Sequence, residues 1–92
     1  MMFPDPIHIH ILYRDGVDRI TGTLSEDILV SKGMVFVLLL QNIFASYPDI
    51  EKQYPPGSIG FAVNDVPPDV YDELHDNDIV LITGSSSIKM AN

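Results

Sequence analysis

The sequence predicts an α+β domain, in which a mixed sheet of four or five strands carries one main helix packed on one face. Residues 7–13 alternate apolar and polar side chains, which is typical of a half-buried strand. Residues 32–47 place apolar side chains at helical spacing, and residues 79–83 form the short apolar run of a buried strand. Because 92 residues leave room for one core only, we expect a single domain over residues 1–84.

The first expected strand, residues 7–13, turns its isoleucines toward the core, so His8 and His10 project from the opposite face. Two imidazoles at this spacing can hold zinc or nickel if His75 or a carboxylate supplies a third ligand. We expect no metal, and we interpret both histidines as facing solvent or a partner. A metal-binding protein that uses His8 and His10 stays as an alternative function.

An Asp-Gly pair within residues 14–18 is the strongest short hairpin signal in the chain. We therefore expect a turn there and a return strand over residues 19–24, with Gly22 marking a bulge. Residues 28–30 either extend this return strand or pair separately.

The main helix is expected over residues 32–47, with Ser31 as its N-cap. Its first half has the propensity of a strand, but the apolar side chains continue at helical intervals, and this favours a helix. Pro48 ends the helix, because the residue before a proline avoids helical angles. Either a loop covers the apolar excess of this helix, or the helix joins a partner chain in a homodimer or a stable hetero-complex. The excess residues are Met34, Val37 and Phe44.

The second half of the chain predicts two further strands. We expect a loop over residues 53–58, a strand over 59–63, a connector over 66–74 with one helical turn near 69–73, a tight turn over 75–78, and the last strand over 79–83. The resulting order is hairpin, helix, strand, connector, strand. The β-grasp (ubiquitin-like) fold is the commonest small fold with this order.

Two motifs lie in this second half. The strand at residues 59–63 ends in a Val-Asn pair, and residues 74–82 read Leu-x-Asp-Asn-Asp-x-Val-x-Ile. These motifs, together with the Tyr-Pro pair after the helix, resemble the MoaD/ThiS family, which includes the small subunit of molybdopterin synthase and the ubiquitin-related modifiers. Asn77 stands where the family has a glycine, and asparagine also tolerates left-handed backbone angles. The resemblance implies a β-grasp fold and a non-enzymatic protein.

Members of that family act through a C-terminal Gly-Gly, whose carboxylate a partner enzyme activates as an acyl-adenylate and sulfur converts to a thiocarboxylate. The sequence contains no Gly-Gly pair, and Gly84 follows the last strand alone. We expect Gly84 to be a turn residue, residues 85–92 to be a flexible tail, and the protein to be a divergent member without the diglycine. The alternative is a genuine sulfur carrier of a molybdopterin, thiamine or thio-modification pathway, with a processed or unusual C-terminus.

The resemblance also implies a docking surface, because the sheet face away from the helix commonly binds proteins in a β-grasp. The expected docking residues are His8, His10, Arg14 and Phe61. The implied partner is a protein similar to the activating enzyme or to the large subunit.

Composition excludes several other classes. The absence of cysteine excludes disulfides, zinc thiolate sites and thiol nucleophiles. A net charge of −8 with five Lys and Arg disfavours nucleic acid and anionic membranes. No apolar stretch approaches the ~20 residues of a membrane span, and no signal peptide is present, so we expect a soluble, cytoplasmic protein. The acidic residues between 65 and 78 have no pocket around them in this interpretation, so we expect no catalytic residue and no cofactor.

Overall fold

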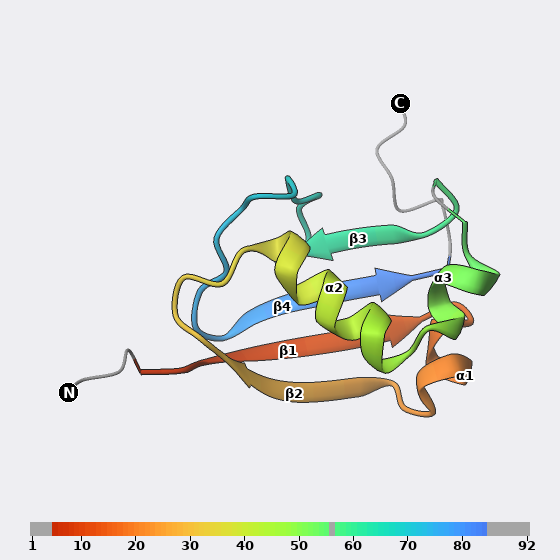
Figure 1. The fold of residues 1–92 in the computed structure, drawn as a ribbon, viewed down its shortest axis with the longest axis horizontal. Helices are drawn as coiled ribbons and strands as arrows, with labels where there is room; N and C mark the ends of the chain where they lie inside the picture. Colours follow the sequence, from red (N-terminus) through yellow and green to blue (C-terminus); the bar gives the residue numbers. More distant parts are fainter. Residues whose placement is uncertain (1–4, 56, 85–92) are drawn as a thin grey trace.

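The computed structural model describes residues 5–55 and 57–84. Four strands form one mixed sheet, and a helix crosses one of its faces (Figure 1). The strands are β1 (Ile7–Arg14), β2 (Ser25–Val30), β3 (Gly60–Val63) and β4 (Asp78–Thr83). Their order in the sheet is β2-β1-β4-β3, with the central pair β1 and β4 parallel and both outer pairs antiparallel. The predicted α+β class, with four strands and one main helix, is confirmed. The tail predicted over residues 85–92 lies outside the described residues.

The connection between the first two strands differs from the prediction. Residues 17–21 form a short helix, α1 (Val17–Thr21), and the return strand is β2. The spacing of Val17 and Ile20 explains the helix, because one helical turn directs both side chains toward the core, where Val17 is fully buried. Gly22 is the left-handed C-cap of this helix, with φ 79°, and not a strand bulge. The strand predicted over residues 19–24 was therefore wrong.

The main helix, α2 (Phe36–Ser46), begins later than predicted and Ser31 is not its N-cap. The N-cap is Val35, whose side chain cannot accept a hydrogen bond. Carbonyls of the connector take over this role: the amide of Phe36 donates to Asp72 O at 2.8 Å, and that of Val37 donates to Val70 O at 2.9 Å. The connector thus runs along the start of α2. Of the helical turn predicted near residues 69–73, the structure has a single hydrogen-bonded turn, in which the amide of Asp72 donates to Asp69 O at 3.1 Å.

A third helix, α3 (Asp49–Gln53), was not predicted. Pro48 ends α2 as expected, but its fixed φ of −62° also suits the start of a new helix. Ile50 in α3 is fully buried and therefore ties this helix to the core.

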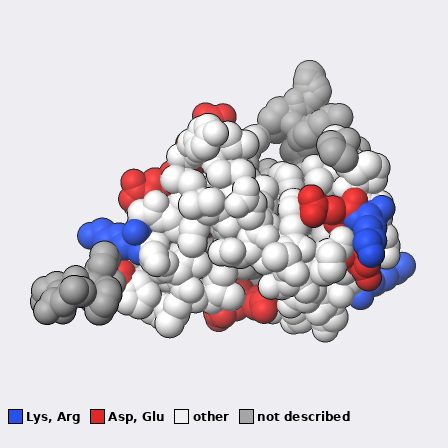
Figure 2. Space-filling view, viewed as in Figure 1, with Lys and Arg blue, Asp and Glu red and all other residues white. Residues whose placement is uncertain are grey.

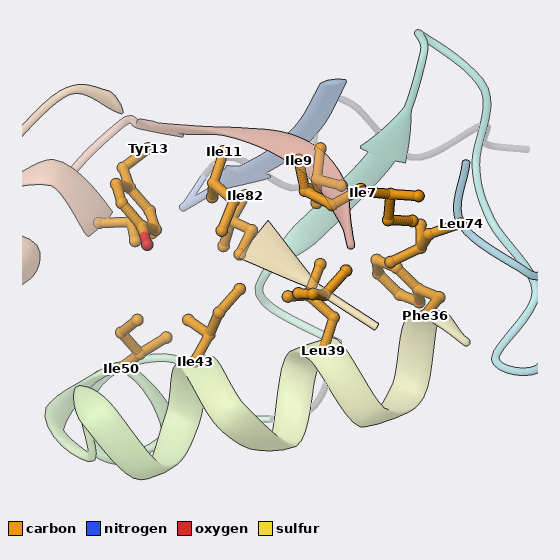
Figure 3. Close-up of a cluster of buried hydrophobic side chains, with 13 residues drawn as sticks. Ile7, Ile9, Ile11, Tyr13, Phe36, Leu39, Ile43, Ile50, Leu74 and Ile82 are labelled. Atoms are coloured by element: carbon orange, nitrogen blue, oxygen red, sulfur yellow. The ribbon is translucent and has the colours of Figure 1, made fainter. Parts of the chain in front are cut away.

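The core lies between the sheet and α2 (Figure 3). Alternating side chains of β1 and β4 meet one stripe of α2, and single residues from α3 and the connector close the ends. The labelled members are Ile7, Ile9, Ile11, Tyr13, Phe36, Leu39, Ile43, Ile50, Leu74 and Ile82. Of the predicted apolar excess, Met34 and Phe44 pack partly buried against this core, and Val37 is half-buried. Leu38, which was not among the predicted residues, is 47% exposed. No helix among the described residues is long and apolar enough to cross a membrane.

Candidate functional site

The sheet has an open face, defined here as the face opposite α2, which none of the described helices covers (Figure 1). The strand register places on it alternate residues of the two central strands and of β2. They are His8, His10, Leu12, Arg14, Ser25, Asp27, Leu29, Ile79, Leu81 and Thr83. Leu29 is 59% exposed and Ile79 is 45% exposed, so this face presents an apolar surface to solvent. Sequence reasoning missed Ile79 because residues 79–83 were interpreted as a buried strand, and it missed Leu29 because the pairing of residues 28–30 was left open.

His8 connects β1 to the turn before β4. Its backbone amide donates to Asp76 Oδ1 at 2.7 Å, and its Nδ1 lies 3.3 Å from the same oxygen. The hydrogen bond from the amide, with help from the imidazole, holds the pKa of Asp76 below its ordinary value. Asn77 adds a bond from its own amide to His8 O at 2.7 Å, and it does so in the left-handed conformation, with φ 69°. This left-handed position is therefore filled by a residue that tolerates the angle.

His10 connects β1 to β2 on the same face. It stands opposite Asp27 in the ladder, and its Nδ1 lies 2.7 Å from Asp27 Oδ1. This hydrogen bond is the main reason that the pKa of His10 is raised. The two histidines thus each face a carboxylate. Among the described residues no group of three His, Cys, Asp or Glu side chains could hold a metal ion.

Arg14 lies at the end of the open face. Its Nη1 donates to Tyr13 O at 2.8 Å and to Leu24 O at 2.6 Å, so the guanidinium closes the end of the β1–β2 pair. Phe61 lies on the other side of the sheet, edge-to-face with Phe36 at 5.7 Å between ring centroids. The structure therefore brings together three of the four expected docking residues and places Phe61 away from them.

Asn64 and Asp78, which belong to the two sequence motifs, fix the connection between β3 and β4 by hydrogen bonds. Asn64 Nδ2 donates to Asp78 Oδ1 at 2.8 Å, and Asn64 Oδ1 accepts the amide of Ile79 at 3.0 Å. Asp78 Oδ2 accepts the amide of His75 at 2.8 Å. Asp78 is buried, so these bonds replace the water that its carboxylate has lost. These hydrogen bonds account for the motif as a structural element. A hollow of about 370 Å³ lies beside it, lined in part by Asp72, Glu73 and Asp78, so the expectation that the acidic residues have no pocket around them was wrong.

Gly84 continues the parallel ladder after β4, and its amide donates to Arg14 O at 3.1 Å. A Cβ at this position would collide with the carbonyl oxygen of Asp15 and would lie 2.7 Å from Cε1 of Tyr54. Thr83 Oγ1 donates to Asp15 Oδ2 at 2.5 Å beside it. Glycine is thus required here by close packing against backbone.

A hollow of about 400 Å³ lies on the helix side of the sheet, between α2, α3 and β3. Its lining is mostly apolar and consists of Leu40, Phe44, Glu51, Tyr54, Gly57, Ile59 and Phe61. No pattern in the sequence predicted it, because it arises from the packing of α3, which was itself missed. Figure 2 views the molecule from this helix side, where charged side chains gather at the margins and the middle is uncharged.

Comparisons with known proteins identify the fold. No family model matches the chain, and no curated protein matches it. Solved structures do: a protein described as a candidate molybdopterin converting factor, subunit 1, from Pyrococcus furiosus superposes with a TM-score of 0.76 at 18% identity, covering 86% of this chain and 98% of that one. Small archaeal modifier protein 1 of H. volcanii superposes with a TM-score of 0.73 at 10% identity, covering 86% of this chain and 98% of that one. The small archaeal modifier protein 1 of Methanosarcina acetivorans superposes with a TM-score of 0.70 at 13% identity, covering 88% of this chain and 95% of that one. The predicted β-grasp fold is confirmed, and identities this low establish the fold alone.

Proposed function

We propose that this protein is a non-catalytic, ubiquitin-like module that acts by binding another protein through the open face of its sheet. The observation that carries the proposal is the pair of exposed apolar side chains, Leu29 and Ile79, on a face that no described helix covers. His8 and His10 on β1 lie between them, since His8 pairs with Leu29 of β2 and His10 with Ile79 of β4. The face therefore mixes apolar and hydrogen-bonded polar side chains, as the surfaces of non-obligate protein interfaces do.

The polar part of this face is preorganised, because His8 and His10 are already held by Asp76 and Asp27. Binding would therefore cost little side-chain entropy at these positions. The fold and the motif resemblance support a partner similar to an activating enzyme or to the large subunit of a molybdopterin synthase. We place the protein among relatives of the sulfur carriers and assign it no thiocarboxylate chemistry.

The test is calorimetric titration of such a purified partner with three forms of the protein. Wild type should bind, and Leu29→Ser/Ile79→Ser should weaken binding at least tenfold, since losing buried interface side chains costs about 1.4 kcal/mol or more. Leu38→Ser is the matched control, because Leu38 is an exposed leucine on the helix side. Equal affinity of all three forms, or weakening by the control alone, would contradict docking at the open face.

The genuine sulfur carrier remains the second candidate, because the matched fold includes a protein described as a converting-factor subunit. Against it, the only glycine directly after β4 is wedged between Asp15 and Tyr54. Intact mass spectrometry after incubation with an activating enzyme, ATP and a sulfur source distinguishes the two functions. Replacement of a carboxylate oxygen by sulfur on the chain would overturn the non-catalytic proposal.

A further inference from the structure

The hollow between α2, α3 and β3 is an apolar site with one charge. Phe44 and Phe61 form one wall, with ring centroids 6.5 Å apart, and Tyr54 forms another. Glu51 is the only charged residue of the lining, and no ion pair is found for it among the described residues. An enclosed void of about 150 Å³ already holds a benzene-sized group, so about 400 Å³ accommodates two aliphatic side chains. The hollow therefore fits a short apolar segment that carries a positive charge.

The chain passes this hollow where it leaves the sheet. Gly84 lies against the ring of Tyr54, closely enough that a Cβ there would be 2.8 Å from Tyr54 Cζ. Tyr54 in turn lines the hollow. The described part of the chain therefore ends at Gly84 beside Tyr54, at the edge of the hollow.

The sequence after Gly84 has the chemistry that the hollow requires. Residues 85–92 contain two long apolar side chains, Ile88 and Met90, and one charge, Lys89, which is positive. Ile88 is four residues beyond Gly84, and an extended chain spans about 13 Å over that distance, enough to pass one tyrosine ring. Attachment to the same chain gives the segment an effective concentration in the millimolar range, so a weak interaction suffices.

We propose that the hollow is the docking site of the protein's own segment of residues 85–92, held by Ile88 and Met90 with Lys89 near Glu51. Docked in this way, the segment buries the exposed edges of Phe44, Tyr54 and Phe61. It also occupies the helix side of the molecule and leaves the open face free. This inference does not depend on the proposed docking partner.

Nuclear magnetic resonance of the full 92-residue chain with ¹³C-labelled methyl groups tests the proposal. The methyl group of Met90 should shift upfield and show nuclear Overhauser effects to the rings of Phe44 and Phe61, because it lies against aromatic faces. The variant Ile88→Ser/Met90→Ser should move the methyl resonances of Leu40 and Ile59. The control Ser85→Ala/Ser86→Ala, in the same segment, should leave them in place.

Two results would overturn the proposal. A Met90 methyl at its unstructured chemical shift, with no ring contacts and no response of Leu40 or Ile59 to the double variant, would show that the segment does not dock. Ring contacts seen only between differently labelled molecules in a mixed sample would show that the occupant comes from a second copy. Neither result bears on the open face, so failure here leaves the proposed function standing.

Discussion

Asn64, Asp76 and Asp78 show how the polar residues of this chain are used, because each of them accepts or donates hydrogen bonds that fix a backbone turn. His10 differs, since its partner Asp27 lies on an edge strand and both side chains are partly exposed. The Tyr13 hydroxyl is buried beneath the sheet and donates to Glu26 Oε1 at 2.7 Å. These two residues give pH-dependent behaviour that can be measured.

We predict that Asp27→Asn lowers the pKa of His10, because it removes the carboxylate that favours the imidazolium. The folded-state pKa of His10 lies above its ordinary value of 6.5, so the pair stabilises the fold fully below about pH 6.5 and loses this effect as the pH rises through that pKa. A ¹H–¹³C titration of the imidazole measures it directly. Asp49→Asn, a charge change on α3, serves as control, and an unchanged His10 titration in Asp27→Asn would contradict the assignment.

We predict that Tyr13→Phe removes part of the alkaline instability of the protein. Burial and the hydrogen bond to Glu26 raise the pKa of Tyr13 far above its ordinary 10.0, so the folded state keeps a proton that the unfolded state releases. Stability is therefore complete below about pH 10 and falls as the pH rises further. At neutral pH the variant should lose about 1–3 kcal/mol, since Glu26 loses a donor. Urea unfolding of wild type and Tyr13→Phe at pH 7 and above pH 10 tests both effects. An equal loss of unfolding free energy above pH 10 in the two proteins would contradict the role of Tyr13 in alkaline instability, and equal stability at pH 7 would contradict the contribution of its hydrogen bond.

Among the elements, α2 shows most clearly what sequence reasoning can reach. Its apolar spacing predicted a helix, and alternation predicted β1, because both patterns are local. Its start was misplaced, because the acceptors for its first amides are carbonyls of Val70 and Asp72, more than thirty residues away along the chain. The same limit applies to α1, which forms because Val17 is buried in the tertiary core. It applies also to the pairing of His10 with Asp27, which depends on the register of β2 against β1.

We predict that the amides of Phe36 and Val37 exchange with deuterium slowly, although the first amides of a helix usually exchange fast. Asp72→Ala should speed their exchange roughly fivefold, a loss of about 1 kcal/mol, because Asp72 Oδ2 holds the turn by accepting the amide of Asp69 at 2.9 Å. Exchange at Ile43, in the middle of α2, should not change. Fast exchange of Phe36 and Val37 in wild type would show that the connector does not cap the helix.

At the scale of the whole molecule, the two sides of the sheet have different surfaces. The open face combines apolar and hydrogen-bonded polar side chains, whereas the helix side is uncharged in its middle (Figure 2). The predicted homodimer through α2 is untested and stays a prediction. Met34 and Val37 are only partly buried, and Leu38 is the large apolar residue of α2 that is exposed.

Sedimentation velocity over a range of concentrations tests this homodimer. We expect a dimer whose mass falls to that of the monomer in Leu38→Glu, because a charge would be buried in the interface without a partner. Leu29→Glu, on the open face, is the matched control and should leave the dimer intact. A monomer at all concentrations would rule out association through α2.

The parallel pairing of β1 with β4 has a consequence for how the protein is made. Ile9 lies beside Asp78 and Tyr13 beside Ile82, so the central ladder joins the first strand to the last. On the ribosome, β1 can pair with β2 and pack against α2 long before β4, its second neighbour in the sheet, has been synthesised. One flank of β1 therefore stays open during most of translation, and the sheet closes in a single late step, when β4 enters between β1 and β3.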